Sequence, residues 1–255
     1  MHAVAPIQIT KAQQEQYREE GYFILESVIP EEHLRLLRDC CQASIERVNA
    51  KMDAQGVVKL GINLRDNRYF CGFPSNDDPQ LREFYFSPLM AEICKATIGG
   101  TAYYFWEQYV VKAAEKGMTF SWHQDSGYCR DVPGHPPYVT CWCALDDMSE
   151  ANGTAYILPY GRAGSRELKE HVHDPRTNDL IGYHGEDPGV PVLAPAGSIA
   201  VFSSFTFHRS GFNRTNGWRR VYLAQYSPIP MASPEGKLMG RAEPFLKDGE
   251  LVAKA

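Results

Sequence analysis

The sequence predicts a mainly β fold with α-helices at its N-terminal end. Beyond about residue 95 the chain consists of short runs rich in aromatic and β-branched residues, bounded by Gly, Pro or Asn-Gly, which is typical of strands. Residues 8–50 instead carry two amphipathic patterns with helical spacing. The strand runs do not alternate with helices, which disfavours a doubly wound parallel sheet. The whole chain, 1–255, is compatible with one domain, because β-sandwiches and barrels often reach this length.

The N-terminal segment contains signals for two helices. Thr10 with Gln13 three residues later predicts a capping box at the start of the first. Gly21 and Pro30 separate the two patterns, and Pro30 suits the first turn of the second helix. The apolar residues of this second helix recur at helical spacing: Leu34, Leu36, Leu37 and Cys41. We interpret both helices as scaffold.

Five segments in the second part of the chain have the texture of strands: 101–113, 136–145, 153–159, 197–204 and 218–228. Many short strands with turn signals between them predict a sandwich or barrel over residues 95–230. Residues 161–192 are long and polar for a connection, and such loops often carry function.

Composition excludes several classes of protein. The net charge is −5 and no run of Lys and Arg offers a phosphate footprint, so a nucleic-acid partner is disfavoured. No apolar stretch approaches the ~20 residues of a membrane span. Neither a secretory signal nor a peroxisomal address is recognisable, which favours the cytoplasm. The 7 cysteines lack a C-x-x-C pair, so buried thiols are expected rather than disulfides or structural zinc.

The stretch "SWHQDSGY" at 121–128 raises the question of a metal site. On a strand, His123 and Asp125 would point to the same face. A second histidine, His208, follows the strand predicted at 197–204. Two histidines and one carboxylate form the facial triad of mononuclear non-haem Fe(II), which leaves coordination positions open. For His208 taken alone, a structural histidine is the better interpretation.

An arginine in the last predicted strand has an unusual position. Strand alternation places Arg219 on the same face as Val221, Leu223 and Gln225, which is the expected interior, and Arg220 on the other face. A buried guanidinium needs a partner. The carboxylate of an organic acid, bound by the guanidinium through two parallel hydrogen bonds, would provide one. The alternative is a second surface arginine.

The ordered motifs resemble those of the phytanoyl-CoA dioxygenase family of Fe(II)/2-oxoglutarate oxygenases. The resemblance covers roughly residues 8–230 and implies a double-stranded β-helix, or jelly-roll, with helices packed outside. It rests on these segments: residues 9–38, His123-Gln124-Asp125, residues 138–159 and His208-x-Ser210-x-x-Asn213, followed by Arg219.

The resemblance also implies roles for individual residues. By motif, His123, Asp125 and His208 would be the iron ligands. Arg219, 11 residues after His208, stands where the family grips the far carboxylate of 2-oxoglutarate, and Ser210 stands where a hydroxyl can assist. Two further positions match the co-substrate pocket, although a strand polar residue and a core aromatic are equally good interpretations: Gln108 and Trp142.

The family's chemistry predicts an enzyme that uses Fe(II), 2-oxoglutarate and O2 to hydroxylate a small-molecule metabolite. Halogenating relatives replace the acid at position 125 with a small residue, so Asp125 favours hydroxylation. Desaturation, ring closure, epimerisation or a non-catalytic jelly-roll that binds a small molecule remain alternatives. We expect a monomer or a homodimer.

Several residues are candidates for contact with the substrate. Tyr128, Arg130 and Arg162 are candidate substrate residues on a rim formed by 126–138 and 161–190, and Arg162 stands where the family usually has histidine. Arg65 and Arg68 could also meet an anion, although solvated surface is the commoner role of arginine. The aromatic residues near these segments suit either a cavity or the core: Tyr103, Phe105, Trp106, Trp122 and Tyr128. Two further histidines could be a metal pair but are more readily interpreted as an exposed loop pair: His171 and His173.

Overall fold

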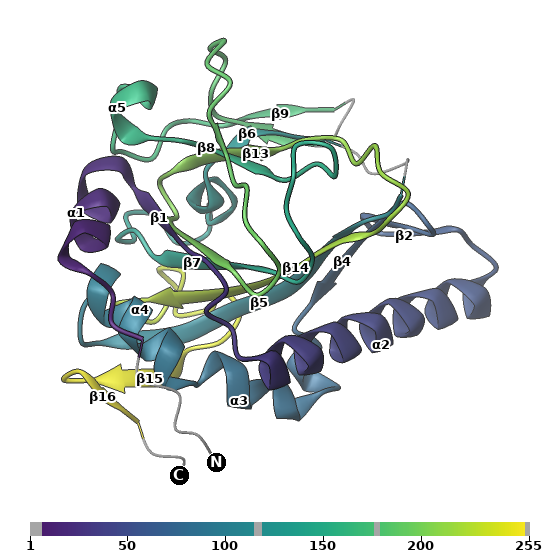
Figure 1. The fold of residues 1–255 in the computed structure, drawn as a ribbon, viewed down its shortest axis with the longest axis horizontal. Coiled ribbons are helices and arrows are strands. Elements are labelled where there is room, and N and C mark those ends of the chain that lie inside the picture. The colour runs from purple at the N-terminus through teal and green to yellow at the C-terminus, as the bar shows by residue number, and fades with distance from the viewer. Residues whose placement is uncertain (1–6, 115–118, 176–178, 253–255) are drawn as a thin grey trace.

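The computed structural model describes residues 7–114, 119–175 and 179–252. A large and a smaller antiparallel sheet form the body of the molecule, and helices lie on the outer side of the large sheet (Figure 1). The prediction of a mainly β jelly-roll with packed N-terminal helices is confirmed.

The large sheet follows the order β1-β12-β7-β14-β5-β4-β3-β2, and β15 with β16 joins it beside β5. The bounds of its strands are β1 Tyr22–Leu25, β2 Lys59–Leu60, β3 Asn63–Leu64, β4 Arg68–Gly72, β5 Ala102–Lys112, β7 Val139–Ala144, β12 Ile199–Ser203, β14 Arg219–Ser227, β15 Glu243–Lys247 and β16 Glu250–Leu251. Strand β14 lies at the centre of this sheet, between β7 and β5.

The smaller sheet has the order β11-β8-β13-β6, and β9 pairs with β10. Its strands and the separate pair are β6 Phe120–His123, β8 Ala155–Leu158, β9 Val172–Asp174, β10 Asp179–Ile181, β11 Val190–Pro191 and β13 Phe207–Ser210. All five segments that the sequence predicted as strands form strands, β5, β7, β8, β12 and β14, slightly shorter than expected.

The helices are α1 Lys11–Glu20, α2 Glu31–Gln55, α3 Arg82–Tyr85, α4 Pro88–Thr97 and α5 Tyr160–Ala163, with 3-10 turns η1 Pro74–Asn76, η2 Pro79–Leu81 and η3 Asp125–Tyr128. The predicted capping box is present, since the Gln13 amide donates to the Thr10 hydroxyl and the Thr10 amide donates to the Gln13 side chain. Pro30 does not lie in the first turn of α2 but directly precedes it. No helix in the described part of the chain is long and apolar enough to cross a membrane.

Two parts of the fold differ from the sequence prediction. Residues 22–25, between the two predicted helices, form β1 and pair with β12 at the edge of the large sheet. The sheet also extends beyond the predicted bounds of 95–230, because β2, β3 and β4 precede β5 and β15 follows β14. Pairing partners distant in sequence decide both features, and no local pattern reports them.

Strand β14 separates the two main hydrophobic regions. Tyr222 and Tyr226 pack in the core beneath the helices, whereas Val221 and Leu223 belong to the cluster between the sheets. The face that carries Arg219 is therefore directed between the two sheets, as alternation predicted. The seven cysteines are free and buried.

Candidate active site

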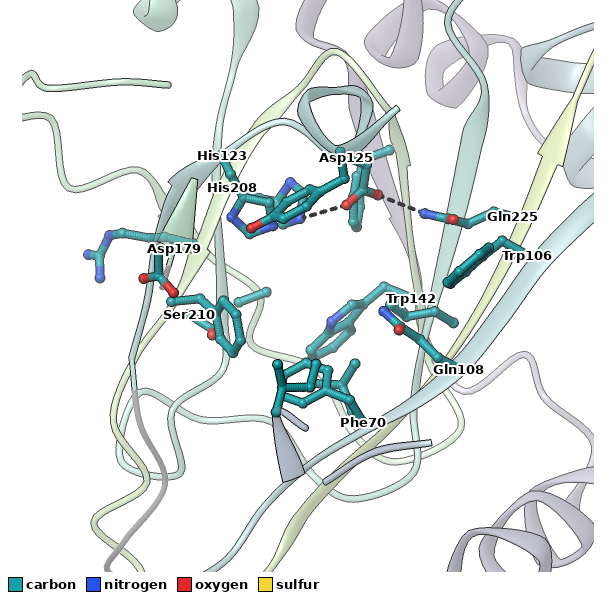
Figure 2. A pocket seen from close by; sticks show the side chains of 18 of the residues that line it. Phe70, Trp106, Gln108, His123, Asp125, Trp142, Asp179, His208, Ser210 and Gln225 are labelled. Atoms are coloured by element: carbon teal, nitrogen blue, oxygen red, sulfur yellow. Dashed lines mark hydrogen bonds and ion pairs between the residues drawn. The ribbon is translucent and has the colours of Figure 1, made fainter. Parts of the chain in front are cut away.

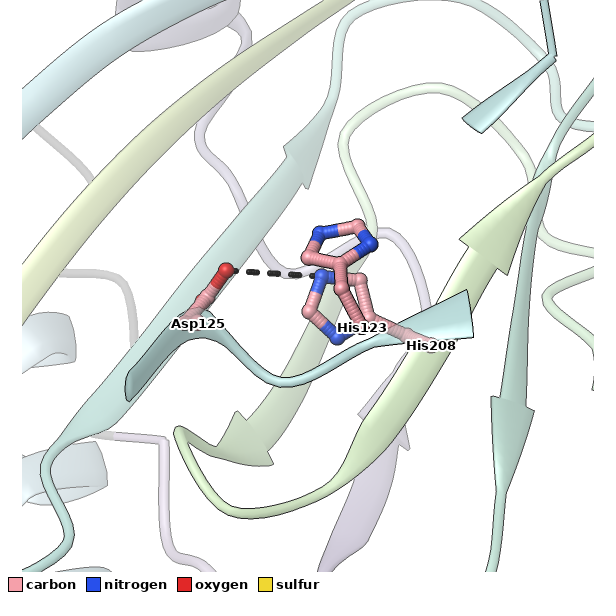
Figure 3. Close-up of side chains that lie close together, drawn as sticks. All are labelled: His123, Asp125 and His208. Carbon is pink, nitrogen blue, oxygen red and sulfur yellow. Dashed lines mark ion pairs between the residues drawn. The ribbon is translucent and has the colours of Figure 1, made fainter. Parts of the chain in front are cut away.

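Three side chains that could bind a metal converge between the sheets. Donor atoms of His123, Asp125 and His208 all lie within 4.8 Å of one another, and Figure 3 shows the two imidazoles facing the carboxylate. His123 ends β6 and pairs directly with His208 on β13. The prediction that Asp125 lies on the same strand as His123 is wrong: Asp125 is the first residue of the turn η3. The change of direction after β6 brings its carboxylate toward the histidines.

Backbone contacts orient both imidazoles. His123 Nδ1 lies 2.8 Å from the Ser121 carbonyl oxygen, and His208 Nδ1 lies 3.1 Å from the Thr206 carbonyl oxygen. A carbonyl only accepts, so each Nδ1 carries a proton and each Nε2 is the ring nitrogen left to face the site. This is the arrangement that metal-binding histidines require.

The Asp125 carboxylate is held through one of its oxygens. Its Oδ2 accepts from the Thr140 hydroxyl at 2.6 Å and from Gln225 Nε2 at 2.9 Å. Its Oδ1 faces His208 Nε2 at 3.4 Å. One oxygen is thus fixed by the large sheet, and the other is directed toward the histidines. Sequence reasoning missed Thr140, which no local signal identifies.

The protonation states suit a metal site. Burial, reinforced by the neighbouring His208, lowers the pKa of His123 to about 3, so this imidazole is neutral at neutral pH. Burial acts to raise the pKa of Asp125, but His208 and the hydrogen bonds to the carboxylate outweigh it and the pKa is lowered. The donor set of two imidazoles and one carboxylate therefore fits a divalent ion such as Fe(II).

The three side chains line a cavity of about 420 Å³ between the sheets. Figure 2 shows them at one side of it, with Gln108 and Trp142 directed into it. The cavity wall is rich in aromatic residues: Phe70, Trp106, Phe120, Tyr128, Tyr138 and Trp142. Of the aromatic candidates from the sequence, Trp106 and Tyr128 line the cavity, whereas Phe105 and Trp122 lie in separate core clusters.

Arg219 lines this cavity and is only 1% exposed. Its Nη2 donates to the Gly153 carbonyl at 3.3 Å, and its Nε is buried without a hydrogen-bond partner. Burial lowers the pKa of Arg219 to about 10, so the guanidinium remains charged at neutral pH. Arg220 faces the other way and binds the Asp146 carboxylate through Nε and Nη2.

The other predicted co-substrate residues also border the cavity. Gln108 on β5 and Trp142 on β7 align across the sheet, because both pair with Leu223 of β14. The Arg219 guanidinium lies 5.8 Å from the centre of the Trp142 ring. Ser210 is the last residue of β13, two residues beyond His208.

Lys112, at the end of β5, was missed by sequence reasoning. It pairs in register with Arg219 and is 2% exposed. Its Nζ donates to the Ser210 hydroxyl at 2.8 Å and to the Gly211 carbonyl at 2.5 Å. Burial, and then the charge of Arg219, lower the pKa of Lys112 well below its usual value. The sequence indicates that Lys112 lies on the same strand face as Gln108, but it does not indicate the contact with Ser210.

The candidate substrate residues are divided by the structure. Tyr128, 46% exposed, lines the cavity, with its ring centre 5.6 Å from that of His123. Arg130 borders a different surface hollow and donates to the His171 carbonyl. Arg162 is exposed on α5 and forms an ion pair with Asp187. Neither arginine is among the described residues that line the metal-side cavity.

The remaining charged candidates also lie in different places, some at the cavity and some away from it. Arg68 lines the cavity, whereas Arg65 binds Asp53 on α2. His171 is buried at 9% exposure and accepts from the Gln124 amide, so the interpretation as an exposed loop pair is wrong for it. His173 is exposed on β9. Of the rim predicted at 126–138 and 161–190, three residues line the cavity: Tyr128, Tyr138 and Asp179. Residues 176–178 of this rim lie outside the described part of the chain. Further wall residues come from β4, from β5 and from Met239.

Known proteins share this chain's sequence pattern and fold. The family model for phytanoyl-CoA dioxygenase (PhyH) matches residues 17–221. A probable phytanoyl-CoA dioxygenase of Caenorhabditis elegans is 24% identical over 83% of this chain and 73% of its own length. An L-proline trans-4-hydroxylase of Streptomyces griseoviridis is 24% identical over 84% of each chain.

A solved structure shows the same fold. EctD from S. alaskensis, crystallised with 2-oxoglutarate and 5-hydroxyectoine, superimposes with a TM-score of 0.70 over 95% of this chain and 88% of its own, at 16% identity. The family match covers well over half of the chain and spans both the His123–Asp125 motif and Arg219. The chain therefore belongs to the phytanoyl-CoA dioxygenase family of enzymes, as its motifs predicted.

Proposed function

We propose that this protein is an Fe(II)- and 2-oxoglutarate-dependent dioxygenase that hydroxylates a small-molecule metabolite. One observation carries the proposal: the His123, Asp125 and His208 set and the buried cation of Arg219 border the same cavity. In the balanced reaction, one oxygen atom of O2 enters the substrate C–H bond as a hydroxyl. The other enters succinate, which forms from 2-oxoglutarate with release of CO2.

The metal would be held by the two Nε2 atoms and by Asp125 Oδ1. The iron, when bound, supplies O2 activation coupled to oxidation of 2-oxoglutarate. The protein keeps both imidazoles in the correct tautomer through Ser121 and Thr206. Thr140 and Gln225 hold the carboxylate in place. Such supporting hydrogen bonds typically matter 10- to 100-fold in metal affinity or activity.

Arg219 would bind the far carboxylate of 2-oxoglutarate. Its guanidinium is charged, buried and lacks an ion-pair partner among the described residues, so a ligand carboxylate relieves an otherwise costly burial. Ser210, Gln108 and Trp142 border the same space and complete the proposed co-substrate pocket.

The substrate would occupy the remaining cavity. A volume of about 420 Å³ lies at the small end of ligand pockets and favours a compact molecule. The aromatic wall keeps water away from the reacting C–H bond. Tyr128, close to His123, is the predicted substrate residue that this arrangement best supports. Arg68 adds a positive charge to the wall.

Hydroxylation is favoured over halogenation because Asp125 fills the coordination position that a halide would need. A monomer or homodimer and a cytoplasmic location remain predictions.

The test is turnover of 2-oxoglutarate. Purified protein with Fe(II), ascorbate and O2 should convert 2-oxoglutarate to succinate even without substrate, at a basal rate, and His208→Ala should abolish this conversion. A screen of small metabolites then identifies those that accelerate the reaction and gain 16 Da in mass. A protein that binds iron and 2-oxoglutarate but forms no succinate would instead be a binding protein. A coupled product that gains no oxygen would indicate another oxidation.

A further inference from the structure

Two buried basic side chains lie side by side at one end of the cavity. Lys112 and Arg219 face each other on neighbouring strands, and both are almost fully buried. Within the described residues, their hydrogen bonds go to uncharged oxygens, those of Ser210, Gly211 and Gly153. The carboxylate of Asp179, which also lines the cavity, attracts Lys112, and that of Asp146 attracts Arg219; within the described residues neither carboxylate accepts a hydrogen bond from the base that it attracts. A buried guanidinium without a contacting anion is costly, and the lysine beside it adds further N–H donors, so this end of the cavity is suited to a negatively charged ligand.

The two basic side chains differ in their access to the cavity. Arg219 and Ser210 line it, whereas Lys112 lies behind Ser210 and is not among the lining residues. Lys112 therefore does not replace Arg219 as the ligand-binding cation. It reaches the cavity through the Ser210 hydroxyl.

The hydrogen bond between Lys112 and Ser210 determines what the hydroxyl can do. A serine hydroxyl has one proton and two lone pairs. Because Ser210 Oγ accepts from Lys112 Nζ at 2.8 Å, its own proton is free to be donated elsewhere. The same Nζ is anchored by the Gly211 carbonyl, which leaves it little freedom to move away.

Close packing of two glycines creates this arrangement. A Cβ on Gly153 would lie 2.5 Å from the Gly211 carbonyl oxygen, and Gly153 has a φ of +74°. The two carbonyls are acceptors for different basic side chains, Gly153 for Arg219 and Gly211 for Lys112. The close contact between Gly153 and Gly211 therefore places the acceptor carbonyls of Arg219 and Lys112 next to each other.

From this geometry we infer that Lys112 is a positioning residue that turns the Ser210 hydroxyl proton toward the co-substrate carboxylate held by Arg219. The inference rests on the proposed function, because it requires 2-oxoglutarate in this cavity. It assigns Lys112 a role in binding the co-substrate, without contact with the metal or with the reacting C–H bond.

The test is a double-mutant cycle in which the affinity for 2-oxoglutarate is measured. Calorimetry on protein loaded with Mn(II), without O2, would compare wild type, Lys112→Met, Ser210→Ala and the double variant. We expect each single change to weaken 2-oxoglutarate binding about tenfold, as for loss of one hydrogen bond to a charged group. The double variant should be no weaker than Ser210→Ala, because Lys112 acts through the hydroxyl. Effects that multiply to about a hundredfold would overturn the inference.

Controls separate positioning from folding. Lys112→Met should leave Mn(II) affinity unchanged and should not lower the melting temperature, because replacing a buried charge by an apolar chain of similar length is often neutral or stabilising. Lys112→Gln retains a donor for Ser210 and should bind 2-oxoglutarate more tightly than Lys112→Met. Lys247→Met, at an exposed position on β15, is the matched control and should bind like wild type.

The outcomes also distinguish this inference from the proposed function. If wild-type protein binds no 2-oxoglutarate, both are wrong. If wild type binds and Lys112→Met binds equally well, only the role of Lys112 is refuted. Should Lys112→Met fail to fold, comparison of Lys112→Gln in the wild-type and Ser210→Ala backgrounds decides, since any loss that persists without the hydroxyl contradicts positioning through Ser210.

Discussion

Arg219 and Arg220 are adjacent in sequence but should respond oppositely to the same substitution. Arg219→Met removes the buried guanidinium that faces the cavity, and Arg220→Met removes the one that binds Asp146. The two variants lose the same charge from the same strand. Each is therefore the matched control for the other.

The magnitudes follow from the contacts. Among the described residues, Arg219 has one hydrogen bond, at 3.3 Å, and a buried Nε without a partner, so most of its donors remain for a ligand. Loss of a charge-assisted pair costs about 1.5–3 kcal/mol, which corresponds to about 10- to 150-fold in the Kd for 2-oxoglutarate. Arg220 contacts Asp146 and not the cavity, so its loss should change this Kd by less than about twofold.

Thermal stability should show the opposite order. Arg219→Met removes an incompletely paired buried charge and should leave the melting temperature of the ligand-free protein unchanged or higher. Arg220→Met breaks a partly buried ion pair worth roughly 1 kcal/mol, which lowers the melting temperature by about 2–4 °C in a protein of this size.

Calorimetric titration with 2-oxoglutarate and a thermal melt of each variant measure both quantities. Equal weakening of 2-oxoglutarate binding by the two variants would refute the strand-face reasoning. So would full affinity in a folded Arg219→Met protein.

Three further predictions concern the metal site. Asp125→Ala should abolish hydroxylation without creating an efficient halogenase, because a halide site also needs tuned surroundings; mass spectrometry of products formed with chloride present checks this, and hydroxylation at the parent rate would show that Asp125 is not a ligand. Gln225→Leu should weaken Fe(II) binding about tenfold by releasing Asp125 Oδ2, and a metal titration giving wild-type affinity would contradict this. The metal-free protein should lose stability as the pH falls from about 6.5 toward the lowered pKa of His123, about 3. Over this range the imidazole binds a proton in the unfolded chain but not in the folded protein, so the free energy of unfolding falls by about 1.4 kcal/mol per pH unit. If thermal melts of His123→Gln at several pH values show the same slope, His123 is not its source.

Local pattern was sufficient where the physical constraint is itself local. Alternation along a strand placed Arg219 on the inner face and Arg220 on the outer one, because successive side chains of a strand point to opposite sides. The capping box at Thr10 was likewise legible, since both of its partners lie within one helical turn. The order of the His123, Asp125 and His208 motifs identified the family for the same reason, as a pattern along the chain.

Contacts between distant segments were decided only by the tertiary structure. Asp125 reaches the histidines because η3 turns away from β6, not because it shares a strand face with His123. Nothing in the sequence distinguishes Arg68, which lines the cavity, from Arg162, which pairs with Asp187.

Lys112 illustrates the limit best. The sequence by itself determined that Lys112 lies on the strand face that also carries Gln108. The pairing of β5 with β14 and the closure of the smaller sheet over them then buried this lysine against Ser210, 98 positions away. The physical reason is that side-chain direction depends on the backbone of a few neighbouring residues. Burial, ion pairing and the charge of a cavity instead depend on which distant strands are brought together.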